Sequence, residues 1–135
     1  MGAGPNFLLD KGFTANGTTA YAVGEAVTLD TAVQSMKRIG AAATAADVVM
    51  IAMEAVDASK LVANPGKITL RARMLGIGRG IAGAAVAKGA RLTTNASSRF
   101  VTQGSAGGIV VGVALEAAAG DGSSFEILLT PASTL

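Results

Sequence analysis

The sequence predicts a mainly β protein: a compact antiparallel barrel or sandwich with a weak internal duplication and an extended N-terminal arm. Three observations predict it. Short alternating apolar runs are separated by turns rich in Gly, Asn, Asp and Pro. One order of strand-like runs and turns occurs twice, about 60 residues apart. Half of the 135 residues are hydrophobic but only 4% are aromatic, so we expect a core of small and branched aliphatic side chains.

Residues 1–20 are predicted to form the arm, because Gly, Asn and Pro interrupt every regular period there. The large apolar residues that could anchor this arm are Phe7, Leu8, Leu9 and Phe13. They are candidate contacts, either with the protein's own domain or with a neighbouring molecule.

A single β-domain is expected over residues 21–135, with half-repeats at about 21–75 and 83–130. Residues 22–30 resemble residues 87–95, and Gly24 matches Gly89. Residues 48–55 resemble residues 110–117, and Glu54 matches Glu116. Each half then has a turn signal and a closing strand, at residues 68–72 and 125–129.

Residues 41–60 have two interpretations. Alone, this Ala-rich stretch favours a helix that Asp47 could cap. Its counterpart, residues 107–116, is rich in glycine and β-branched residues, as strands are. Because equivalent segments should share a structure, we predict strands in both, with the helix as the alternative.

Charge is distributed unevenly although the net charge is only +2. The stretch from Ala58 to Leu115 holds eight of the eleven basic residues and no acidic one. Within it, Arg71 and Arg73 alternate with apolar residues of a predicted strand and should face solvent together. Either the stretch offers a basic face to an acidic partner, or the acids at both ends of the chain fold back and neutralise it.

Composition argues against an enzyme. The chain has no histidine and no cysteine, which excludes Ser-His-Asp triads, thiolate chemistry, zinc fingers and disulfides. We therefore expect no catalytic, cofactor-binding or metal-binding residues. The glycine motif at residues 78–83 lacks the helix and the following acid of a dinucleotide site, and we interpret it as a hinge between the half-repeats. Glu54 and Glu116 are better explained as equivalent strand ends than as a paired-carboxylate site.

Neither specific nucleic-acid binding nor membrane binding is expected. The basic stretch contains one aromatic residue, Phe100, whereas proteins that bind single strands place several aromatics among their basic residues. No apolar run is long enough for a signal peptide or a membrane span.

The C-terminal half resembles the small capsid decoration, or cement, proteins of tailed bacteriophages. Three features carry the resemblance: a first strand with Val86, Gly89 and Leu92, a small-residue segment around Glu116, and a short final strand over residues 125–130. The match covers residues 83–130 and, more weakly, residues 22–74.

The resemblance implies a virion structural protein, made in the host cytoplasm, that binds the capsid exterior and stabilises the shell. It also implies the major capsid protein as partner, a homotrimer, and no cofactor. The alternatives are another virion component, such as a head-fibre base or tail-tube subunit, and a small carbohydrate-binding β-domain. As candidate capsid or subunit contacts we take the four arm residues together with Arg71 and Arg73.

Overall fold

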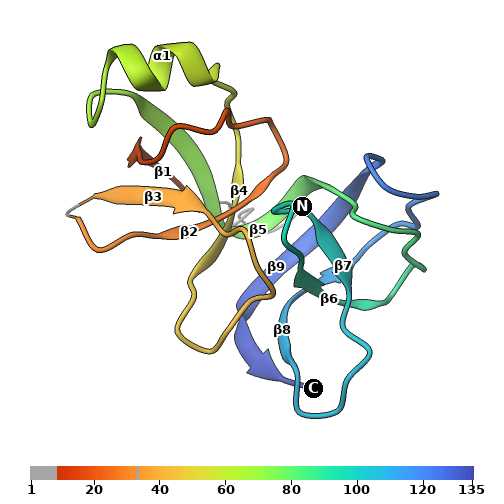
Figure 1. The fold of residues 1–135 in the computed structure, drawn as a ribbon. Coiled ribbons are helices and arrows are strands. Elements are labelled where there is room, and N and C mark those ends of the chain that lie inside the picture. Colours follow the sequence, from red (N-terminus) through yellow and green to blue (C-terminus); the bar gives the residue numbers. More distant parts are fainter. Residues whose placement is uncertain (1–8, 33) are drawn as a thin grey trace, which may run out of the picture.

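The computed structural model describes residues 9–32 and 34–135. These residues form short strands and one short helix (Figure 1). In chain order they are β1 (Leu9–Ala15), β2 (Ala26–Leu29), β3 (Ser35–Arg38), β4 (Val49–Ala52), α1 (Ala58–Ala63), β5 (Thr69–Ile81), β6 (Arg91–Thr94), β7 (Phe100–Thr102), β8 (Ile109–Ala114) and β9 (Ser124–Thr134). The predicted mainly β class is confirmed.

All the strands join one sheet in the order β1-β3-β2-β4-β5-β9-β8-β6-β7. An additional antiparallel pairing of β1 with β5 closes the first five strands of this order into a barrel. Closure removes the free edges that a five-stranded sheet would otherwise expose.

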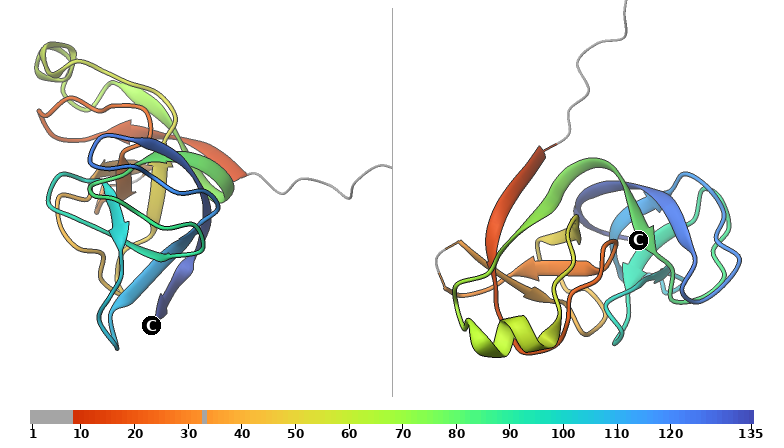
Figure 2. Two further views of the ribbon diagram at one scale, coloured as in Figure 1. Left: turned by 90° about the vertical axis from the view of Figure 1, so that its right-hand side faces the viewer. Right: turned by 90° about the horizontal axis from the view of Figure 1, so that it is seen from above.

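The second half of the chain repeats the strand pairing of the first. We call residues 9–75 unit 1 and residues 76–135 unit 2; they lie side by side (Figure 2). In unit 1, β2 pairs with β3 and β4, and β4 pairs with β5, always antiparallel. In unit 2, β6 pairs with β7 and β8, and β8 pairs with β9, again antiparallel.

Individual hydrogen bonds repeat as well. Gly24 and Gly89 both have positive φ, 94° and 85°, and their amides donate over 2.8 Å to the carbonyls of Ala52 and Ala114. Each unit also has an isolated antiparallel bridge, which joins Tyr21 to Val56 in unit 1 and Val86 to Ala118 in unit 2. The duplication suggested by the sequence is therefore present down to backbone contacts.

Strand β5 belongs to both units. Its residues up to Leu75 pair with β1, whereas Gly76–Ile81 pair with β9. The glycine motif at residues 78–83 begins inside this continuous strand, so the predicted hinge is wrong. The second part of β5 pairs with β9 in unit 2, just as β1 pairs with the first part of β5 in unit 1. It therefore takes the place of β1 in unit 2.

Two apolar clusters fill the interior. The cluster of unit 1 consists of Phe13, Ala15, Tyr21, Val27, Met36, Met50, Ala52, Val56, Leu61, Leu70 and Ala72. The second cluster fills unit 2 but also includes Ala26, Val49 and Ile51 of unit 1. Strand β4 is thus buried on both faces, with Met50 inside its own unit and Ile51 against the other.

The predicted arm is wrong for Leu9–Ala15, which form β1. This strand pairs with β5 and, in parallel, with β3. Phe13 is 3% exposed in the unit 1 core, so it is not available to a partner. The partners of β1 on β5 lie more than 50 residues away in the chain, and local periodicity does not reveal them. Phe7 and Leu8 lie outside the described residues.

Residues 41–60 contain less strand than predicted. Strand β4 covers Val49–Ala52, which confirms the strand over its central part. Residues 41–48 form a bend, a turn and irregular backbone instead, and the helix α1 starts only at Ala58. Leu61 on α1 is buried against the unit 1 core and holds the helix there.

We expect Phe13→Ala to destabilise the fold by about 3–5 kcal/mol, because it removes a buried aromatic ring from a core with few large side chains. Leu9→Ala, on the same strand but 52% exposed, is the matched control and should cost below about 1 kcal/mol. Chemical denaturation of both variants measures the difference. Equal stabilities would contradict the assignment of β1 to the core.

Gly80 occupies the position in unit 2 that Phe13 occupies in unit 1. A Cβ there would lie 2.4 Å from Ile127 Cδ1 and 2.8 Å from the Phe100 ring. We expect Gly80→Ala to cost about 1–3 kcal/mol through overpacking. Adding Ile127→Val, which removes the nearest methyl group, should recover part of that loss. Gly120→Ala, where a Cβ meets nothing within 4 Å, is the control.

Candidate interaction surface

The basic stretch is partly neutralised within the subunit. Three of its arginines form ion pairs with acids from outside the stretch: Arg73 with Asp10 at 2.7 Å, Arg79 with Glu116 at 2.8 Å and Arg99 with Asp121 at 2.7 Å. A fourth pair joins Arg38 to the buried Glu25. These contacts support the interpretation in which the ends of the chain fold back onto the middle.

Arg71 and Arg73 differ in environment although they share one face of β5. Arg71 is exposed, as predicted. The Arg73 side chain is only 15% exposed, and its Nε and Nη2 donate to the two carboxylate oxygens of Asp10 at 2.7 and 3.0 Å. This hydrogen-bonded pair lowers the pKa of Asp10 and raises the pKa of Arg73. The prediction that both face solvent is therefore wrong for Arg73.

The two matched glutamates perform one structural task. Glu54 Oε2 accepts a hydrogen bond from the Arg71 amide at 2.8 Å, and Glu116 Oε1 accepts one from the Glu126 amide at 3.0 Å. Each carboxylate binds the backbone of the closing strand of its own unit. This confirms their interpretation as equivalent strand ends.

An apolar surface extends over β5, β9 and β8. Along β5, Leu75 and Ile77 are 40% and 44% exposed. Leu9 pairs with Leu75, and Leu128 lies between Ile77 and the half-buried Val113. We call Leu9, Leu75, Ile77, Val113 and Leu128 the outer face. Large apolar side chains gathered outside a sheet are typical of a surface that binds another protein.

Basic residues border the outer face. Arg71 and Arg79 share the alternation of Leu75 and Ile77 on β5, and the exposed Arg91 pairs with Val113 on the neighbouring strand. Arg79 is paired with Glu116, whereas Arg71 and Arg91 form no ion pair within the described residues. The border therefore favours partners with acidic groups around an apolar centre.

A groove of about 340 Å³ adjoins the outer face where the two units meet. Leu75 belongs to both. Val48 and Met74 line the groove from unit 1, and Thr130 and Pro131 line it from unit 2. Its lining is mainly apolar, so it enlarges the surface that could contact a partner.

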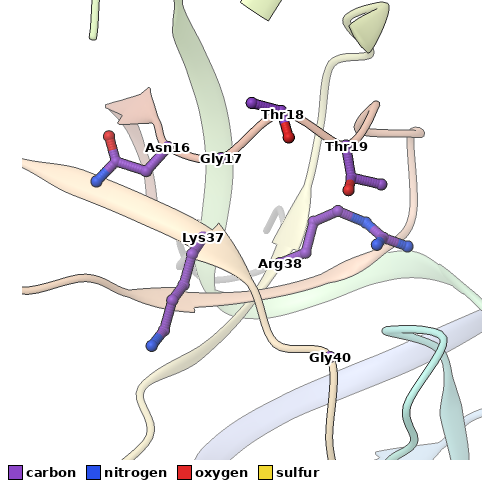
Figure 3. Close-up of a pocket in the computed structure, with 7 residues that line it drawn as sticks. All are labelled: Asn16, Gly17, Thr18, Thr19, Lys37, Arg38 and Gly40. Carbon is purple, nitrogen blue, oxygen red and sulfur yellow. The ribbon is translucent and has the colours of Figure 1, made fainter. Parts of the chain in front are cut away.

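A second hollow, of about 250 Å³, lies on unit 1 beside the loop that follows β1 (Figure 3). It is lined by Asn16, Gly17, Thr18, Thr19, Lys37, Arg38 and Gly40. Arg38 is engaged with Glu25, and Lys37 points away from the two threonines. This lining is polar, with hydroxyls and cations, and the side-chain amide of Asn16 donates to the Asp30 carboxylate at 2.9 Å.

Nearby, the side chain of Tyr21 supports the same loop. Its hydroxyl donates to the carbonyl of Asn16 at 2.6 Å, and burial raises its pKa to about 12. The hydroxyl thus helps to hold the loop after β1 in place.

Across residues 9–32 and 34–135, no three acidic, histidine or cysteine side chains are grouped so that they could hold a metal ion. Helix α1 is too short to cross a bilayer, and no other helix is present in that part of the chain.

The Asp10–Arg73 pair predicts a pH effect on stability. Because folding lowers the pKa of Asp10, its contribution is present above the carboxyl's usual value of 3.8 and is lost as the pH falls through the lower folded value. We expect Asp10→Asn to cost about 1 kcal/mol at pH 7 and less at pH 2, where a larger share of the Asp10 carboxyl is protonated. Thermal unfolding at both pH values measures this; Asp57→Asn, an exposed acid before α1, is the control. A loss that does not change with pH would contradict it.

Comparisons with known proteins find similarity at the level of fold. No protein-family model and no curated protein sequence matches the chain. Among solved structures, the N base of the head fiber protein gp8.5 of bacteriophage phi29 has a similar fold, with a TM-score of 0.60 and 16% sequence identity. The match covers 96% of this chain and 98% of that one.

Proposed function

We propose that this protein is a structural component of a tailed-phage virion that attaches to the capsid exterior. The observation that carries the proposal is the fold match to a phage head-fiber base over nearly the whole length of both chains. The independent resemblance of residues 83–130 to capsid decoration proteins supports the same location. Neither observation favours a tail-tube subunit or a carbohydrate-binding domain.

Two roles fit this location. A decoration protein stabilises the shell, because many copies of a modest contact add up over its surface. A head-fibre base instead attaches to the shell and carries a further protein. The sequence resemblance favours the first role and the fold match favours the second, so the experiment below measures both.

The proposed partners are the major capsid protein and further copies of this chain in a closed oligomer, most simply a homotrimer. A core rich in small side chains gains stability from such neighbours. The candidate contact is the outer face, which includes Leu9, together with Arg71 on its border. Arg73 is less suited because Asp10 already occupies its guanidinium.

Undecorated capsids mixed with the purified protein, imaged by cryo-EM and heated in parallel, test the proposal. We expect density on the outer surface at symmetry-related positions. A shell that resists higher temperature indicates decoration, whereas an unchanged melting temperature with a protruding base indicates fibre attachment. Shells without external density would overturn both roles.

Association should depend on salt if Arg71 contributes to attachment, since exposed charges are screened over about 10 Å at 0.1 M ionic strength. We expect Arg71→Glu to slow association several-fold at low salt and to change dissociation less. Lys88→Glu makes the same charge change at an exposed position between β5 and β6 and serves as control. Equal association rates for the two variants, at every salt concentration, would remove Arg71 from the interface.

A further inference from the structure

The contact between the two units is head to tail, because two different surfaces meet. Unit 1 contributes the start of β2 and the adjoining loop, and unit 2 contributes the end of β5 and the turn between β6 and β7. The Ala26 amide donates to Ser98 O at 2.8 Å, and the Ile81 amide donates to Gly24 O at 3.0 Å. Thr94 Oγ1 donates to Ala41 O at 2.7 Å. We call the unit 1 side the strand surface and the unit 2 side the turn surface.

Strand register identifies the counterpart of the strand surface in unit 2. Ala26 pairs with Ile51 in unit 1 just as Arg91 pairs with Val113 in unit 2. Ala26 and Ile51 are fully buried by the contact between units. In contrast, Arg91 is exposed and Val113 is half-buried. Gly24 is likewise buried, whereas its counterpart Gly89 is exposed. Unit 2 therefore presents an uncovered copy of the strand surface, continuous with the outer face.

The turn surface has an uncovered copy too. Ser98 and Gln34 have similar positive φ values, 59° and 55°, although neither is glycine. The amides of Asn95 and Asp30, which start the two turns, each donate over 3.0 Å across the turn, to Arg99 O and Ser35 O respectively. The residue before Asn95 in unit 2 is Thr94, and the residue before Asp30 in unit 1 is Leu29. Leu29 is 41% exposed, whereas Thr94 is 1% exposed at the contact between units.

The uncovered copies differ from the covered ones in a complementary way. On the strand surface, Arg91 stands where unit 1 has Ala26. On the turn surface, Asp30 stands where unit 2 has Asn95, and its carboxylate is already oriented by the Asn16 amide at 2.9 Å. A cation on one open surface and an anion on the other favour pairing between molecules. Leu29 adds an apolar side chain on the turn surface, which suits contact with the apolar Val113 and the adjacent Leu128 on the strand surface.

We propose that a second copy of the chain binds through these surfaces, with Leu29 and Asp30 of one molecule against Arg91 and Val113 of the next. The contact repeats, between molecules, the contact already made between units. Because each molecule carries both surfaces, such head-to-tail contacts form a ring when the rotation closes. The inference rests on the oligomer in the proposed function and names the surfaces that build it.

The absence of cysteine from the chain permits a direct test. Leu29→Cys and Arg91→Cys are made as separate variants, given tags of different size, and treated with a short bismaleimide at high protein concentration. A crosslinked heterodimer should form only in the mixture, because a head-to-tail contact places position 29 next to position 91. Crosslinking of either variant with itself, or none in a mixture that light scattering shows to be oligomeric, would overturn the proposal. If the unsubstituted protein stays monomeric at all concentrations, the proposal is overturned as well.

Charge exchange supplies a second measurement. Arg91→Asp and Asp30→Arg should each weaken self-association about tenfold, and the double variant should recover most of it. Circular dichroism checks that all three fold. If the double variant associates no better than the single ones, the pairing of Arg91 with Asp30 is wrong. Capsid binding by the weakened variants separates the two proposals. If these variants attach to the capsid without self-associating, the proposed function stands. If single molecules occupy isolated sites on the shell, the capsid covers the outer face and a second copy does not.

Discussion

The shared strand β5 is the constraint on which the rest of the structure depends. Its first part closes the unit 1 barrel with β1 and β4, and its second part pairs with β9. A continuous strand restricts the rotation between the units, because the backbone cannot bend freely where its residues pair with neighbouring strands on both sides of the junction. Gly78 permits the close approach of the two units, because an added Cβ there would lie 3.0 Å from Ile51 Cδ1 of unit 1.

Close approach also explains how a core poor in aromatics suffices. The second apolar cluster takes Ala26, Val49 and Ile51 from unit 1, so neither unit has to bury its surface alone. Ser98 reinforces the junction, since its carbonyl binds the Ala26 amide and its Oγ accepts from the Gly40 amide at 2.9 Å. Loss of packing in one unit therefore exposes apolar surface of the other, and we expect the two to unfold together.

Local pattern in the sequence was sufficient for the class, the duplication and the equivalence of Glu54 and Glu116, because alternation and repeated turns are local properties. It was insufficient for β1 and for Arg73. Strand β1 carries Gly12 and several polar residues, and only its pairing with β5 and β3 shows that it is a strand. Alternation assigned Arg73 to the correct face, but its partner Asp10 is 63 residues away in the chain. The predicted hinge at the glycine motif of residues 78–83 was wrong for a related reason: close packing by distant residues, rather than a bend, requires these glycines.

A duplicated unit joined head to tail always leaves one copy of each joining surface uncovered, whatever its sequence. Such surfaces are aggregation hazards unless side chains there are charged or a partner covers them. Here Arg91 and Asp30 have opposite sign, and one lies on each uncovered surface. Each molecule therefore presents a cation on its open strand surface and an anion on its open turn surface. In the proposed oligomer, this arrangement would oppose contact between like surfaces and favour contact between unlike ones, and so would select head-to-tail assembly over random association of the exposed apolar residues.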